Sequence, residues 1–221
     1  MNPRELVDHI HSGPAKLVLD EPLRFRRRTR SNPCDFNEFL DALQSSETIR
    51  DIRCRSQLRL SITEDEWVLL VKTLGSIKDL QRLEFYCTPG SRRFRPFQAV
   101  ADAVSNARSL SKLAVFHDCD ILPRDSSGLI ALANALREHT ALEQFCWIDH
   151  CSQVEGAQIT AIDPVLWALP ACPHLRKVIV MSKCASADAR KNLLQLHSAT
   201  ELRLVLETEH WLAVADEIQQ G

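Results

Sequence analysis

The chain has 221 residues, of which 45% are hydrophobic, and this composition is ordinary for a globular protein with a sizeable core. The formal net charge of −2 gives no general attraction to nucleic acid or to an anionic membrane. No stretch approaches the roughly 20 apolar residues that span a bilayer, and the first residues lack the apolar run of a signal peptide. We therefore expect neither a membrane protein nor a general nucleic-acid binder.

One pattern of apolar residues recurs along the chain at nearly constant spacing. Leu110, Leu113 and Val115 occupy the first, fourth and sixth positions of a short segment. The same offsets begin at residues 14, 49, 80, 142, 175 and 199, with weaker copies at 14 and 199. The successive starts, that of Leu110 included, are 35, 31, 30, 32, 33 and 24 residues apart. The last positions of each copy alternate between apolar and variable residues, which predicts a strand with one buried face.

Stretches with the period of a helix lie between the predicted strands. Over 126–138, apolar residues recur at intervals of three and four and form one stripe, which Asp125 or Ser126 would cap. Similar patterns predict further helices over 35–43, 64–74, 96–106, 163–169 and 187–196. One strand followed by one helix, repeated with short connections, predicts an α/β solenoid with parallel strands on its concave face and helices on its convex face.

The repeat extends over most of the chain, which predicts a single domain over residues 1–221. About seven strand–helix repeats would occupy 14–206. An amphipathic helix within 1–13 and another within 207–221, over 209–219, would cover the two ends, because an uncovered end exposes core side chains and a strand edge.

The repeat resembles the leucine-rich repeat, whose motif is L-x-x-L-x-L-x-x-N/C-x-L. The segment LSKLAVFHDCDI over 110–121, followed by SSGLIALANALREHTALEQF over 126–145, is most similar to the ribonuclease-inhibitor subfamily. The resemblance covers 14–206 and implies a horseshoe segment that mediates protein–protein contact. Two features depart from the family: the repeats are longer than usual, and Cys119, Cys151 and Cys184 stand at the tenth position rather than the ninth.

The eight cysteines show no disulfide spacing pattern and no secretion signal accompanies them, which favours reduced, structural thiols in the cytoplasm. A metal site with His117, His150 and the tenth-position cysteines is a weaker alternative. So is a catalytic pair of Cys151 and His117 oriented by Asp149. Adjacent turns of a repeat bring such residues together without any chemical purpose, so we predict no enzyme, metal or other cofactor. The four tryptophans are expected to pack in the core: Trp67, Trp147, Trp167 and Trp211.

The fifth and seventh positions of each copy should point to the concave surface, because side chains alternate along a strand. These positions place an apolar patch across the middle repeats, made of Tyr86, Phe116, Cys146, Ile148, Ile179 and Met181. Charged residues flank the patch, and they include Arg53, Arg55, Glu84 and Arg203. An apolar centre with a charged rim is the usual anatomy of a protein interface.

We therefore predict that another protein binds this surface. The alternative is that a second copy of the chain, or a terminal segment of the same chain, covers it. An adaptor or regulatory subunit of a larger assembly, including an enzyme assembly, would look the same in sequence. Nucleic-acid binding is the least favoured role, and it would use the basic stretch with Arg24, Arg26, Arg27, Arg28 and Arg30.

Overall fold

The computed structural model describes residues 3–19, 36–54, 63–87, 95–117, 125–149, 162–182, 185–196 and 201–205. Within them the chain forms one sheet of seven parallel strands, whose order in space is their order in the sequence. The strands are β1 (Lys16–Leu19), β2 (Asp51–Cys54), β3 (Arg82–Cys87), β4 (Lys112–His117), β5 (Gln144–Asp149), β6 (Lys177–Met181) and β7 (Glu201–Val205). The α/β class and the parallel strands are as predicted.

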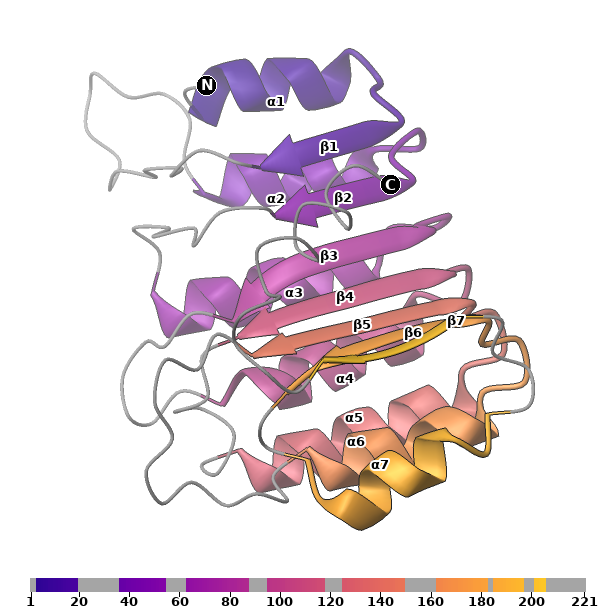
Figure 1. Ribbon diagram of the computed structural model, residues 1–221. Helices are drawn as coiled ribbons and strands as arrows, with labels where there is room; N and C mark the ends of the chain where they lie inside the picture. Colours follow the sequence, from indigo (N-terminus) through magenta and orange to yellow (C-terminus); the bar gives the residue numbers. More distant parts are fainter. Residues whose placement is uncertain are drawn as a thin grey trace.

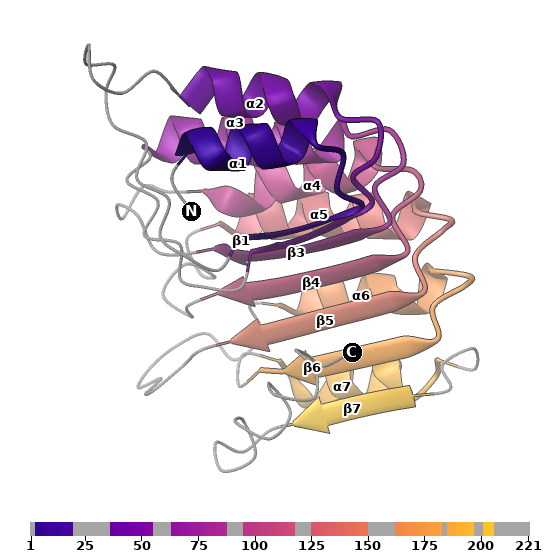
Figure 2. The ribbon, with the colours of Figure 1, turned by 90° about the horizontal axis from the view of Figure 1, so that it is seen from above.

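The helices lie on one side of the sheet. Helices α2 to α7 cover one face, and α1 lies at the β1 end of the sheet and packs against α2 (Figures 1 and 2). The helices are α1 (Pro3–His11), α2 (Phe36–Ser45), α3 (Glu64–Gly75), α4 (Pro96–Asn106), α5 (Ser126–Glu138), α6 (Asp163–Ala168) and α7 (Ala187–Leu193), and a 3-10 helix, Leu169–Ala171, follows α6. We call the sheet face that carries these helices the near face, and the opposite one the far face.

The register of the strands follows the sequence repeat. Leu83 pairs with Leu113, Leu113 with Phe145, and Phe145 with Val178, so equivalent fourth positions stand side by side. The turn before each strand repeats as well, because one carbonyl accepts two backbone N–H groups of the next repeat. The Ser111 carbonyl, for example, accepts from the N–H groups of Glu143 at 2.8 Å and Gln144 at 2.9 Å. The repeat is therefore a structural unit and not only a pattern of hydrophobic residues.

The first, fourth and sixth positions point to the near face and form the main core with the helices. Leu80, Leu110, Leu142 and Leu175, at the first position, are each 0% exposed. The core continues without interruption from Leu6 of α1 to Leu196 after α7. Each repeat therefore buries its apolar side chains against its two neighbours.

Polar groups at the helix starts tie neighbouring helices together. Thr63 and Glu66 form a capping box at α3. Asp125 caps α5 by accepting from the Gly128 N–H at 3.2 Å, and it also accepts from the Phe97 N–H of α4 at 2.7 Å. Asp125 is only 1% exposed, and this burial raises the pKa of its carboxyl group. The predicted cap thus serves two helices at once.

The structure differs from the sequence predictions at several places, and α2 for example ends at Ser45 rather than at residue 43. The α-helix α6 stops at Ala168 and tightens into the 3-10 helix, where Pro170 lacks an N–H for a further helical hydrogen bond. Helix α7 ends at Leu193 rather than at residue 196. Trp167 is 49% exposed, so its prediction as a core residue is wrong, whereas Trp147 is 0% exposed and Trp67 is 8% exposed.

Some predictions concern residues outside the described ranges. They are the C-terminal cap over 207–221, the basic stretch at 24–30, Trp211 and the tenth-position cysteines. Among the helices that are described, none has both the length and the apolar character needed to cross a bilayer.

Candidate functional site

The far face of the sheet carries a second apolar cluster, separate from the main core. We call it the far-face cluster, and it consists of Ala114, Phe116, Cys146, Ile148, Ile179 and Met181, with Tyr86 packed against it. Its members come from the fifth and seventh positions of β3 to β6, because consecutive residues of a strand point to opposite faces. The six apolar residues that the sequence predicts for the interaction surface therefore lie together.

The register brings these side chains into direct contact. Tyr86 pairs with Phe116 across β3 and β4, and their rings stack with centroids 4.7 Å apart and an angle of 16° between their planes. Phe116 pairs in turn with Ile148, and Ile148 with Met181. Neighbouring strands lie about 4.8 Å apart, so the cluster is continuous across four strands.

The far-face cluster is buried, which the sequence does not predict. Phe116 and Cys146 are 5% exposed, Ile179 is 4% exposed, Ile148 is 1% exposed and Met181 is 0% exposed. Tyr86 alone is partly exposed. Burial also raises the pKa of the Cys146 thiol to about 12, with a smaller contribution from the charge of Glu84. The expectation of an open apolar surface is corrected: the side chains point to the predicted face, but solvent does not reach most of them.

A row of charged residues runs across the amino-terminal halves of the strands on the same face. We call it the charged row, and it contains Asp51, Arg53, Arg82, Glu84, Lys112, Lys177, Glu201 and Arg203. Five of its members are basic and three are acidic. The row therefore carries a net positive charge on a chain whose formal net charge is −2.

Ion pairs hold most of the charged row in place. Arg53 pairs with Asp51 at 3.0 Å, and Arg82 pairs with Glu84 at 3.1 Å. At the other end, Glu201 pairs with Lys177 at 3.0 Å and with Arg203 at 2.8 Å. Buried charges persist in proteins only when they are paired in this way, and Arg53, Arg82 and Glu84 are 7%, 7% and 2% exposed.

Lys112 differs from the other basic residues of the row. Within the described ranges no carboxylate lies within ion-pair distance of its ammonium group. Burial, together with the positive charges of Arg82 and Arg53, lowers the pKa of Lys112 to about 8. A new negative partner would therefore stabilise the ammonium of Lys112 more than the charge of any other basic residue in the row.

Of the predicted rim residues, Arg53, Glu84 and Arg203 belong to the charged row. Arg203 is exposed, whereas Arg53 and Glu84 are buried. Arg55 lies outside the described residues.

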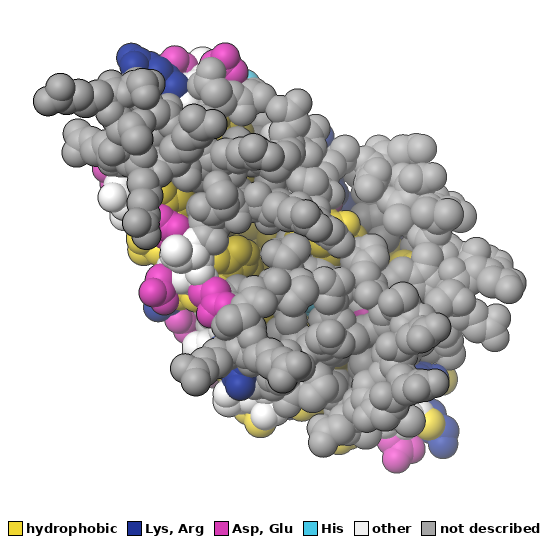
Figure 3. Space-filling model, turned by 90° about the vertical axis from the view of Figure 1, so that its left-hand side faces the viewer, with side chains coloured by type: hydrophobic (Ala, Val, Ile, Leu, Met, Phe, Trp, Pro, Cys, Tyr) yellow, Lys and Arg dark blue, Asp and Glu magenta, His cyan; other side chains and the backbone are white. Residues whose placement is uncertain are grey.

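Figure 3 views the molecule from the side toward which the strands point. It shows hydrophobic side chains of described residues near the middle, with carboxylates beside them.

A buried polar network lies on the near face, at the carboxyl ends of β4, β5 and β6. Asp149 is 0% exposed and accepts from the Trp147 indole N–H at 2.6 Å. It also accepts from the Ser182 hydroxyl, and its other contact is with His117 Nε2. His117, Asp149 and Ser182 all stand at the eighth position of their repeats, so one carboxylate gathers donors from three adjacent strands.

The sequence pairs His117 and Asp149 as catalytic or metal-binding candidates, and the structure does bring these two together. The third catalytic candidate, Cys151, lies outside the described ranges. His117 is 1% exposed and packs edge-on against the rings of Phe97 and Trp147. No group of three or more residues suited to hold a metal ion occurs among the described residues. In this setting Asp149 ties strand ends together. Polar residues at the eighth position of three successive repeats are the sequence signal that could have revealed this network, and the sequence analysis did not use it.

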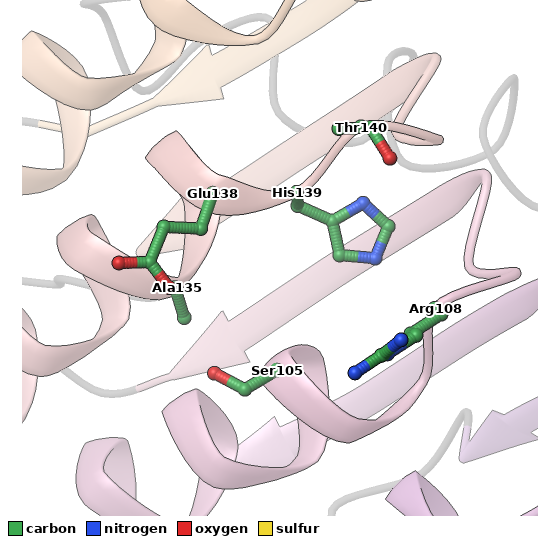
Figure 4. A pocket seen from close by; sticks show the side chains of 6 residues that line it. All are labelled: Ser105, Arg108, Ala135, Glu138, His139 and Thr140. Atoms are coloured by element: carbon green, nitrogen blue, oxygen red, sulfur yellow. The ribbon is translucent and has the colours of Figure 1, made fainter.

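A pocket of about 300 Å³ lies between the ends of α4 and α5 (Figure 4). Its walls include Ser105, Arg108, Glu138 and His139. Both ring nitrogens of His139 form hydrogen bonds with the backbone. Nε2 donates to the Ala107 carbonyl at 3.1 Å, and Nδ1 accepts from the Ala141 N–H at 3.3 Å. Both ring nitrogens therefore hold helix ends together, and neither is left to bind a ligand.

Comparison with models of known protein families gave no match, and a search of curated proteins gave none either.

Proposed function

We propose that the chain is a non-enzymatic protein-binding module of the leucine-rich-repeat type, and that its partner binds the far face of the sheet. The observation that carries this proposal is the far-face cluster itself. A continuous apolar cluster on the side of the sheet opposite the helices contributes nothing to the contact between sheet and helices. An apolar centre bordered by charged groups is the usual anatomy of a protein interface, and the described helices do not cover this face of the sheet.

The repeat architecture supports the proposed type. Seven strands in sequence order, with matching positions in register and helices on one face, are what stacked leucine-rich repeats would produce. Cys54, Cys146 and Cys172 are free thiols, which is consistent with a reducing compartment such as the cytoplasm. A free-standing binding module and an adaptor subunit of a larger assembly would both use the same face.

Because the cluster is buried, binding must begin at the accessible rim. Tyr86, Lys112 and Lys177 are partly exposed, and Arg203 is exposed. Basic side chains at the rim would attract an acidic partner segment and orient it before apolar contacts form. A carboxylate of the partner would stabilise the charged form of Lys112 in particular, because this desolvated ammonium has no ion-pair partner among the described residues.

Affinity capture from native lysate followed by mass spectrometry tests the proposal. The far-face variant carries Lys112→Glu and Lys177→Glu. A matched control carries the same change of charge on the helices, with Lys72→Glu and Lys191→Glu, both of which are exposed. We expect at least one protein to be retained by the wild type and the control and to be lost from the far-face variant. Retention of every wild-type partner by the far-face variant would refute binding through this face.

A further inference from the structure

The carboxylates of the charged row are all bound by basic residues other than Lys112. The pairs are Asp51 with Arg53, Glu84 with Arg82, and Glu201 with both Lys177 and Arg203. Lys112 stands near the middle of the row, on β4, and has no ion-pair partner among the described residues. The other cations of the row are therefore stabilised as cations, and that of Lys112 is not.

The surroundings of Lys112 favour its neutral amine over its ammonium form. Arg82 stands directly opposite Lys112 on β3. The positive charges of Arg82, Arg53 and Lys177 act against a further positive charge, and partial burial withholds the water that would stabilise it. Among the described residues, Glu84 acts in the opposite direction, but its carboxylate is already bound by Arg82. A lysine that lies beside other cations and is partly desolvated is a nucleophile near neutral pH.

We propose that Lys112 is a modification site, at which small anionic acyl donors of the acyl phosphate class acylate the side-chain amine. Lys112 is partly exposed, so a small reagent can reach it. The net positive charge of the row attracts an anionic donor. The guanidinium of Arg82, on the neighbouring strand, adds a fixed positive charge close to where the phosphate and the developing oxyanion would lie.

The reaction is a simple acyl transfer. The lone pair of the Lys112 nitrogen attacks the carbonyl carbon of the acyl phosphate and forms the new C–N bond. The bond between this carbon and the phosphate oxygen breaks, and the phosphate leaves with the electron pair. The nitrogen passes one proton to the departing phosphate, so the products are an amide and hydrogen phosphate. Neither an oxidant nor a reductant takes part.

Acylation removes one positive charge from the charged row. Its biological consequence rests on the proposed function, because an acidic partner that binds this face would then bind more weakly. The reactivity of Lys112 can be measured on the chain alone, with no partner present. A failed test would therefore leave the capture experiment untouched, and a failed capture experiment would leave the modification site standing.

Acetyl phosphate serves as the probe, and the acetylation of each lysine of the native, full-length chain is followed over time by peptide mass spectrometry. Lys177 is the matched control within the molecule, because it holds the same strand position two strands away and is also partly exposed, but is paired with Glu201. Lys78 and Lys191 represent exposed lysines outside the row. We expect Lys112 to react at least about tenfold faster than these three, because a larger share of it is uncharged near neutral pH.

Two further measurements connect this preference to the folded row. In guanidinium chloride, Lys112 and the three control lysines should react at similar rates, because unfolding separates the charges. In native protein, the rate at Lys112 should level off above about pH 8, whereas the rates at Lys78 and Lys191 should keep rising toward the ordinary lysine pKa of 10.5.

Gln144→Glu tests the electrostatic cause, because it places a carboxylate of nearly the same shape directly opposite Lys112 on β5. Acetylation of Lys112 should slow at least about threefold in this variant. It should be unchanged in Gln195→Glu, which adds the same charge at an exposed position after α7. Circular dichroism shows whether each variant is folded.

Two results would overturn the proposal. The first is native wild-type protein in which Lys112 reacts no faster than Lys177, and this comparison decides even if the Gln144→Glu variant does not fold. The second is an unchanged rate at Lys112 in folded Gln144→Glu protein, because the charges around the amine would then not set its reactivity.

Discussion

Replacing Asp149 by Ala should cost more stability than replacing any exposed carboxylate of the chain. The change removes the acceptor of the Trp147 indole and of the Ser182 hydroxyl, together with the contact of His117. A buried donor that loses its acceptor costs about 1–3 kcal/mol, and more than one buried donor depends on Asp149. We expect a loss of about 3–5 kcal/mol, which is a large part of the 5–15 kcal/mol typical of a folded domain.

Urea unfolding followed by far-ultraviolet circular dichroism measures this loss without relying on Trp147 fluorescence, which the substitution itself would change. Asp41→Ala on the exposed side of α2 serves as the control and should change the unfolding free energy by no more than about 0.5 kcal/mol. Asp149→Asn keeps an acceptor oxygen and should lose less than Asp149→Ala. A loss below about 1 kcal/mol for Asp149→Ala would refute the reasoning, because water or relaxation would then satisfy the three donors.

Three further predictions concern packing, titration and the thiols. Gly75→Ala should lower stability by about 1–3 kcal/mol in thermal unfolding, because its new Cβ would clash with the Ala103 backbone where α3 packs against α4; an unchanged melting temperature would contradict this packing. The lowered pKa of Lys112 means that the unfolded chain binds more protons between about pH 8 and its unfolded value of 10.5, so stability should rise with pH through this window. The rise is read as the difference between wild type and Lys112→Met, since the cysteines titrate there too, and a flat difference would contradict it. All eight cysteines should be alkylated in denatured, unreduced protein, and an intact mass that shows fewer labels would reveal disulfides.

The sequence predicted the fold closely because the repeat is encoded locally. The predicted bounds of the helices over 96–106 and 126–138 agree with α4 and α5. Alternation along the strands also placed Phe116 and Met181 on the far face, while Val115 and Val180 point to the near face. Both signals depend on residues within one repeat or its neighbour, so they can be read without tertiary information.

The burial of the far-face cluster could not be predicted from the sequence in the same way. Alternation along a strand gives the face to which Phe116 and Met181 point, but it does not say whether solvent reaches that face. Trp167 was predicted to be buried because it lies on the apolar stripe of its helix. The stripe does not determine how long α6 is or whether a neighbouring element covers the residue. The role of Asp149 was missed because its partners come from three repeats that are read separately along the sequence.

Lysine footprinting of the chain bound to a captured partner tests the central claim most directly. Acetylation of native protein, alone and in complex, reports on Lys112 and Lys177 of the charged row and on Lys72 and Lys191 of the helices. If the partner binds the far face, labelling of Lys112 and Lys177 falls in the complex while that of Lys72 and Lys191 is unchanged. Protection of Lys72 or Lys191 with no change at Lys112 and Lys177 would place the partner on the helices and contradict the claim.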